Sequence, residues 1–208
     1  MARALILVDI QNDFLPGGAL AVPEGDEVIA IANAIIPHFQ HVIATQDWHP
    51  ADHGSFASQN PGAAPGELGT LAGLPQVMWP DHCVQGSHGA AFAEDLHLPP
   101  GASIFRKGTD PTVDSYSGFF DNDRRADTGL ADHLRGLGVD AVYVMGLATD
   151  YCVRFTALDA VSLGFDTTLI ADGCRGVGLK PEDIPAAVEA MSAAGVHVIE
   201  HAAVLNEG

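Results

Sequence analysis

The sequence lacks any apolar run that could cross a membrane. Its first run, residues 5–8, stops at Asp9, far short of the roughly 20 residues that a membrane span needs. We therefore expect no signal-peptide core at the N-terminus. Basic residues are also scarce: nine Lys and Arg face 27 Asp and Glu, giving a net charge of −18. Because such a chain repels phosphate backbones and anionic headgroups, we expect neither a nucleic-acid nor a membrane partner.

Cysteine is rare too, with three residues in the chain. An odd number of cysteines without an export signal is typical of reduced thiols in a cytoplasmic protein. The remaining composition, 47% hydrophobic and 17% charged, is that of a globular protein and excludes a disordered chain. A length of 208 residues suits one domain, so we expect residues 1–208 to form a single domain.

Short, continuous apolar runs alternate with helical patterns. Such runs are typical of strands buried on both faces of a parallel sheet. The predicted strands are residues 4–8, 41–45, 103–105, 141–145, 167–171 and 196–199, and the predicted helices are residues 24–39, 129–137, 150–163 and 182–194. The last three helices each end at a glycine, which favours a C-terminal cap. The alternation predicts an α/β fold with a doubly wound, mostly parallel six-stranded sheet and helices on both faces.

The stretch from about residue 50 to 100 interrupts this alternation. It is rich in Gly, Pro, His and Ser and shows little periodicity. A loop this long within one domain is usually either functional or disordered. Because Trp48, Trp79 and a group of histidines accompany it, we favour a functional insertion.

Polar side chains follow four of the predicted strands, where the ligand crevice of a doubly wound sheet lies. Cys152 is the strongest candidate, because it falls in the first turn of the helix predicted near Thr149. Free backbone N–H groups and the helix dipole there can stabilise a thiolate and an oxyanion. The alternative is that Cys152 is a small buried apolar residue, which we also expect of Cys83 and Cys174.

Asp9 and Lys107 also end predicted strands. Asp9 is a candidate general base for the thiol proton, or else a helix cap or turn residue. Lys107 is one of only two lysines in the chain, the other being Lys180. Its retention at the end of a buried strand indicates a need for an ammonium group, in catalysis or in a structural ion pair.

The pattern Asp47-x-His49 is a candidate metal site. One carboxylate and two imidazoles suit Zn, Fe or Mn and leave positions open for water or substrate. The third ligand could be His53, His82 or His88, and spacing does not choose among them. The pattern is weak alone, since most of the ten histidines should be ordinary surface or packing residues.

Taken together, these motifs resemble the nicotinamidases within the isochorismatase-like cysteine hydrolases. The resemblance runs from about residue 4 to about residue 175, and its order and spacing make it specific. It is carried by Val8–Phe14 with Pro16–Leu20, Gln46–Pro50, Trp79–Val84, Arg106–Gly108, Asp114–Phe119 and Gly146–Val153.

The resemblance implies a role for each candidate residue. The catalytic triad would be Asp9, Lys107 and Cys152. The ligands of one divalent ion (Zn, Fe or Mn) would be Asp47, His49 and His82, with His53 close by, and no organic cofactor is implied. The substrate contacts would be Phe14 and Trp79, which would sandwich a pyridine ring, together with Tyr116 and Ala148.

The implied reaction is hydrolysis of nicotinamide to nicotinate and ammonia through a thioester, as in NAD salvage, with pyrazinamide-like analogues as further substrates. A cis Leu147–Ala148 peptide would let the N–H groups of Ala148 and Cys152 form the oxyanion hole. Two rival functions stay open: a related amide hydrolase without the metal set, and an inactive binding protein, which should lack a triad residue. The oligomeric state and the reason for the acidic composition stay open.

Overall fold

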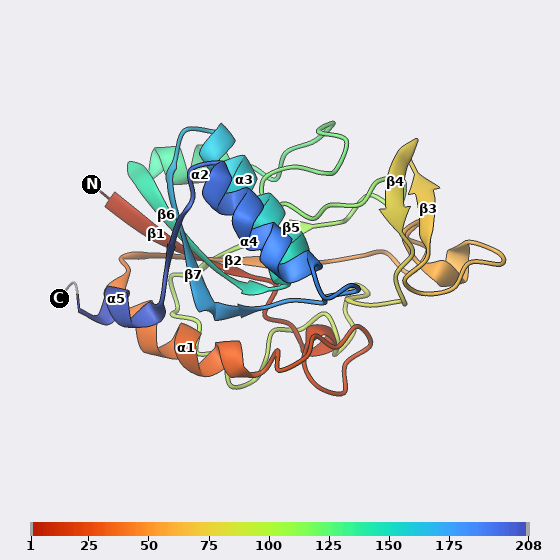
Figure 1. Cartoon of the computed structure of the whole chain (residues 1–208), viewed down its shortest axis with the longest axis horizontal. Helices are drawn as coiled ribbons and strands as arrows, with labels where there is room; N and C mark the ends of the chain where they lie inside the picture. Colours follow the sequence, from red (N-terminus) through yellow and green to blue (C-terminus); the bar gives the residue numbers. More distant parts are fainter. Residues whose placement is uncertain (1, 207–208) are drawn as a thin grey trace.

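Six parallel strands form the central sheet of the computed structural model, which describes residues 2–206. Their order is β5-β2-β1-β6-β7-β8 (Figure 1). The strands are β1 Ala2–Val8, β2 His41–Asp47, β5 Ser103–Lys107, β6 Val139–Leu147, β7 Asp166–Arg175 and β8 His197–Ile199. This arrangement confirms the predicted doubly wound parallel sheet, and all six predicted strands are present. The expected burial on both faces is wrong for the two edge strands, because Ile104 of β5 is 51% exposed and Val198 of β8 is 40% exposed.

Helices cover both faces of this sheet. In Figure 1, α2, α3 and α4 lie on one face and α1 and α5 on the other. They are α1 Glu27–Ile35, α2 Leu130–Gly136, α3 Arg154–Ser162, α4 Asp183–Ala193 and α5 His201–Leu205. The predicted glycine caps after α2, α3 and α4 are confirmed, because Gly138, Gly164 and Gly195 have φ values of 69°, 88° and 100°. Every helix within residues 2–206 is too short or too polar to cross a membrane.

The segment between β2 and β5 contains regular structure that the sequence analysis did not predict. A short helical turn spans Ala57–Gln59, and β3 (Leu68–Leu71) pairs with β4 (Leu74–Val77) as an antiparallel hairpin. The hairpin escaped prediction because its strands are only four residues long and carry few of the usual features. Leu68 is 75% exposed, and Pro75 lies within β4. Helix α5 was also missed, because it has only five residues.

The chain reverses its direction of progress across the sheet between β1 and β6. From β1 the chain moves outward to β2 and β5, whereas from β6 it moves the other way to β7 and β8. A doubly wound sheet binds its ligands beyond the carboxyl ends of the strands at such a switch point. Asp9 follows β1 and Ala148 follows β6, so the fold places both at this crevice.

Candidate active site

The Lys107 ammonium group is the centre of a buried charge cluster. Its Nζ lies 2.8 Å from Asp9 Oδ2 and also pairs with Asp47 Oδ1. It donates a hydrogen bond to the Ser115 carbonyl oxygen at 3.0 Å and lies 3.3 Å from Cys152 Sγ. Burial lowers the pKa of Lys107, but the Asp47 and Asp9 carboxylates outweigh it and raise that pKa well above its usual value. The group therefore stays charged.

Asp9 occupies the turn that leaves β1. Its φ of 48° is left-handed, a conformation that aspartate tolerates better than most residues. The Thr45 hydroxyl donates a hydrogen bond to Asp9 Oδ1 at 2.6 Å. Burial raises the pKa of Asp9 above its ordinary value, although Lys107 opposes the shift. A carboxylate with a raised pKa is a stronger base, which suits proton abstraction at neutral pH.

Cys152 lies in the first turn of a helix that begins at Thr149, as predicted; this turn, Thr149–Val153, is π-helical and continues directly into α3. The expected stabilisation of a thiolate is opposed by burial. Burial raises the pKa of the Cys152 thiol well above its usual value, and Lys107 offsets only part of this effect. Because the resting thiol is protonated, a base must remove its proton. Asp9 is a carboxylate beside it, since an Asp9 carboxylate oxygen and Cys152 Sγ lie within 4.8 Å of each other.

The other two cysteines have different surroundings. Cys83 and Cys174 are buried, and burial raises the pKa of each, to about 12 for Cys174. The Cys174 thiol donates a hydrogen bond to the Ile170 carbonyl oxygen at 3.3 Å, and the Cys83 thiol lies 4.0 Å from the Gly89 carbonyl oxygen. Contact with the Lys107 ammonium group therefore distinguishes Cys152 from both.

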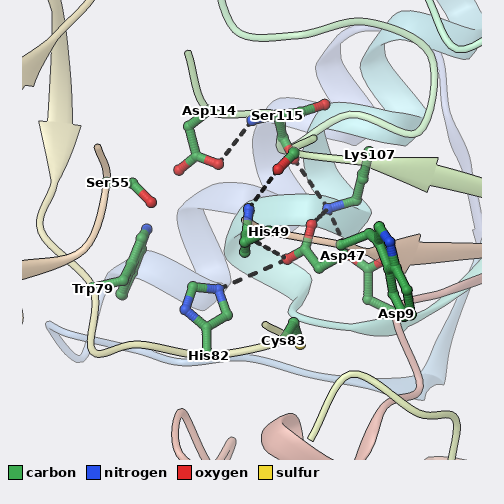
Figure 2. Close-up of polar contacts among 12 residues, drawn as sticks. Asp9, Asp47, His49, Ser55, Trp79, His82, Cys83, Lys107, Asp114 and Ser115 are labelled. Atoms are coloured by element: carbon green, nitrogen blue, oxygen red, sulfur yellow. Dashed lines mark hydrogen bonds and ion pairs between the residues drawn. The ribbon is translucent and has the colours of Figure 1, made fainter. Parts of the chain in front are cut away.

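A potential metal-binding cluster adjoins the charge cluster and shares Asp47 with it. Figure 2 shows Asp47 between Lys107 on one side and His49 and His82 on the other. The Nε2 atoms of His49 and His82 lie 3.6 Å and 3.8 Å from Asp47 Oδ2. All three side chains are buried. The possible ligand atoms lie within 4.8 Å of one another, so one ion could contact them all.

Hydrogen bonds at the far side of each ring orient the two imidazoles. His49 Nδ1 lies 2.8 Å from the Gly108 carbonyl oxygen, and His82 Nδ1 lies 2.8 Å from the Pro80 carbonyl oxygen. A carbonyl oxygen only accepts, so Nδ1 donates in both rings. In the neutral tautomer Nε2 then carries the lone pair facing Asp47. Burial and the positive charge of a protonated His49 lower the pKa of His82 to about 4, which keeps His82 neutral. Burial also lowers the pKa of His49, but the Asp47 carboxylate outweighs it and raises that pKa above its ordinary value, so His49 must lose its Nε2 proton before it can bind an ion.

The other candidate histidines differ in position. The His53 ring centroid is 4.3 Å from that of His49, and His53 Nδ1 hydrogen-bonds the Ser55 hydroxyl at 2.7 Å. His53 Nε2 is buried without a hydrogen-bond partner. His88 is exposed and belongs to none of the potential metal-ligand groups found within residues 2–206. The fold therefore brings His82, rather than His88, to Asp47 and His49.

A largely apolar cavity opens onto Cys152 and onto two of the potential metal ligands, Asp47 and His82. All four residues predicted to contact substrate line it: Phe14, Trp79, Tyr116 and Ala148. The Trp79 indole N–H donates a hydrogen bond to the Tyr116 hydroxyl at 3.2 Å, which holds the two rings together. The Leu147–Ala148 peptide bond is cis, as the resemblance implies.

Comparison with known families identifies the family of this chain. The isochorismatase domain model matches residues 3–203. The chain belongs to the isochorismatase family.

Within this family, the chain is 58% identical to the nicotinamidase of Escherichia coli K12 over 197 residues, covering 93% of this chain and 92% of the relative. A solved nicotinamidase/pyrazinamidase from Acinetobacter baumanii superposes with a TM-score of 0.94 at 45% identity, covering 97% of each chain. The pyrazinamidase of Pyrococcus horikoshii, solved in complex with zinc, has a TM-score of 0.80 at 43% identity and covers 96% of this chain and 99% of that one.

Several residues of this isochorismatase-family site received no role in the sequence analysis, although Asp114 and Ser115 lie within one of its motifs. Thr45 holds Asp9, and the Ser115 carbonyl accepts from Lys107. Asp114 accepts a hydrogen bond from Gln76 of the unpredicted hairpin at 2.7 Å. Thr45 was placed in a predicted strand, but no feature marked it out. Gln76 could not be found without the hairpin that carries it.

Proposed function

We propose that the protein is a nicotinamidase, a metal-dependent cysteine amidohydrolase that converts nicotinamide to nicotinate and ammonia. The observation that carries this proposal is the placement of Lys107 against both Asp9 and Cys152, beneath an aromatic cavity. The 58% identity to a nicotinamidase supports the choice of substrate. We place the reaction in cytoplasmic NAD salvage and include pyrazinamide-like analogues among the substrates.

In the proposed reaction, Asp9 removes the thiol proton of Cys152 and the thiolate attacks the carboxamide carbon. The backbone N–H groups of Ala148 and Cys152 stabilise the oxyanion that forms. Asp9 returns the proton to the leaving nitrogen, and ammonia departs as the C–N bond breaks. Asp9 then takes a proton from water, whose oxygen attacks the thioester. The C–S bond breaks, nicotinate leaves and the thiol is protonated again.

Lys107 stabilises the charges that appear on the reaction path. Its ammonium group lies next to both the carboxylate that loses or gains a proton and the sulfur that becomes negative. The desolvation that raises the pKa of Cys152 also strengthens this attraction, because no water screens it. The negative charge therefore moves between Asp9 and Cys152 while the cation stays fixed.

We assign Asp47, His49 and His82 as ligands of one divalent transition metal ion, with Zn, Fe and Mn as candidates and His53 beside the site. The donor set fits, because one carboxylate and two Nε2 lone pairs converge while a hydrogen bond fixes each ring. When bound, such an ion supplies a site for the pyridine nitrogen of the substrate. The zinc complex of the Pyrococcus relative supports this assignment.

Phe14 and Trp79 are proposed to hold the pyridine ring between them, and Tyr116 to fix the Trp79 indole and contact the substrate. Phe14 also packs against His82, with ring centroids 5.6 Å apart. A ring held at this point lies between the potential metal ligands and the nucleophile, which orients the carboxamide toward Cys152.

The proposal is tested by a coupled assay of ammonia release with nicotinamide and with benzamide, which lacks the ring nitrogen. We expect rapid turnover of nicotinamide, weak turnover of benzamide, and none by Cys152→Ala. Metal-loaded wild-type protein that releases no ammonia from nicotinamide would refute the proposed function. Equal turnover of benzamide would refute the role of the ring nitrogen and favour a metal-independent amide hydrolase.

A further inference from the structure

Val177 lines the catalytic cavity, although it lies outside every motif of the sequence resemblance. It belongs to residues 176–178, the first part of the loop 176–182 that joins β7 to α4 (Figure 1). A segment of three residues without regular structure has no ladder of hydrogen bonds to fix it. The position of this part of the cavity wall therefore depends on other contacts.

The Asp150 carboxylate supplies those contacts. The Val177 N–H donates to Asp150 Oδ1 at 2.9 Å, and the Gly178 N–H donates to Oδ2 at 2.8 Å. Asp150 is only 5% exposed, and both hydrogen bonds described for its carboxylate come from the backbone. One carboxylate thus accepts hydrogen bonds from two successive N–H groups and holds segment 176–178 at two points, and we call this pair of hydrogen bonds the Asp150 clamp.

The segment is also tightly packed and anchored at its start. A Cβ atom on Gly176 would come within 2.5 Å of Ile184 Cγ1, and Gly178 has a left-handed φ of 60°. Arg175, immediately before the segment, forms ion pairs with Glu27 and Glu24. The chain is therefore held just before Val177 by the ion pairs of Arg175, and at Val177 and Gly178 by the hydrogen bonds to Asp150.

Asp150 and Cys152 belong to the same π-helical turn. Asp150, whose carboxylate holds Val177, is thus two residues from the proposed nucleophile Cys152. The turn that carries both residues therefore sets the distance between Val177 and Cys152 Sγ. We propose that Asp150 is a positioning residue that fixes Val177 and so determines which ring substituents of a pyridine carboxamide the cavity admits. This inference rests on the proposed function.

The first experiment measures kcat and KM for nicotinamide and for its 2-, 4-, 5- and 6-methyl derivatives. Val177→Ala should raise the ratio of kcat/KM for at least one methyl derivative to kcat/KM for nicotinamide by about tenfold. This is the lower end of the discrimination that one methylene group produces in an apolar pocket. Asp150→Asn should raise the same ratio, because an amide offers only one acceptor oxygen to the two N–H groups. The double variant should go no further than Val177→Ala alone. Asp183→Asn should leave the ratio unchanged, because the Asp183 carboxylate lines a pocket with Asp150 but accepts its hydrogen bond from the Lys180 N–H rather than from Val177 or Gly178.

The second experiment measures backbone hydrogen exchange and does not depend on activity. In Asp150→Asn the amides of Val177 and Gly178 should exchange at least about ten times faster than in wild type, and in Asp183→Asn they should not. If Asp150→Asn does not fold, Asp150→Ser, which keeps one acceptor, replaces it in both experiments.

Unchanged exchange at Val177 and Gly178 would overturn the clamp whether or not nicotinamide is the substrate. An equal loss of kcat/KM for every substrate in Asp150→Asn would overturn the role of Asp150 in specificity. Asp150 would then act only by stabilising the turn that carries Cys152. Failure of wild type to hydrolyse nicotinamide would instead refute the proposed function, and the exchange result would still decide the clamp.

Discussion

Replacing Lys107 with methionine removes the buried ammonium group while keeping most of the side-chain volume. Nζ lies 3.3 Å from Cys152 Sγ, so at an effective dielectric constant near 20 a full charge pair at this distance interacts by about 5 kcal/mol. At 1.36 kcal/mol per unit, this interaction corresponds to about 4 pKa units of the thiol. Both groups are buried, so solvent screening does not reduce the figure much.

The observed shift should be smaller than this upper figure. Without Lys107, the Asp9 and Asp47 carboxylates lie close together without their shared cation, so one of them takes up a proton. That proton removes a negative charge near the sulfur and lowers the thiol pKa again. We therefore expect Lys107→Met to raise the Cys152 pKa by at least about one unit, which lowers the thiolate fraction about tenfold at a given pH.

The assay is the rate of iodoacetamide labelling of the Cys152 peptide, followed by mass spectrometry from pH 6 to 10. Because the cation lowers the thiol pKa, its loss should move the labelling profile to higher pH. Lys180→Met changes the only other lysine, which is exposed, and should leave the profile unchanged. Thermal unfolding shows whether each variant is folded, since breaking a buried ion pair costs roughly 3–5 kcal/mol. A folded Lys107→Met variant with the wild-type profile would refute the electrostatic role of Lys107.

Two further predictions concern the proposed nucleophile and the proposed metal ligands. Cys152→Ala should abolish ammonia release, whereas Cys83→Ala and Cys174→Ala should retain most of it; a tenth of wild-type activity in Cys152→Ala would exclude the covalent mechanism. Chelation should remove activity that Zn, Fe or Mn restores, and elemental analysis should find the metal reduced in His82→Ala but not in His88→Ala. Full activity in protein free of metal would contradict the proposed ligand set.

The sheet and the main candidate residues could be predicted from the sequence because their information is local. A buried parallel strand reads as an apolar run, and a polar residue at its end falls at the ligand crevice of a doubly wound sheet. Asp9, Lys107 and Cys152 were found in this way. The choice of His82 over His88 could not be made from spacing, because it depends on how a long irregular segment folds back over the sheet.

Other features depend on burial and on contacts between distant segments, which a pattern of residue types does not reveal. The sequence suggested a stabilised Cys152 thiolate from its place near a helix start. In the folded chain, desolvation outweighs Lys107 and raises the thiol pKa instead. Likewise, the sequence places Asp150 near the proposed nucleophile but does not predict its hydrogen bonds. Its partners Val177 and Gly178 lie 27 and 28 residues further along the chain.

Asp47 and Lys107 are cross-strand partners in the register of β2 and β5. Strand β5 lies at the edge of the sheet and pairs with β2 alone. A slip of one residue would turn its side chains to the opposite face and carry the ammonium group away from Asp9 and Cys152. The bonds of Lys107 to Asp9, Asp47 and Ser115 therefore also hold this edge strand in one register, so the residues proposed for catalysis help to specify how the strand pairs.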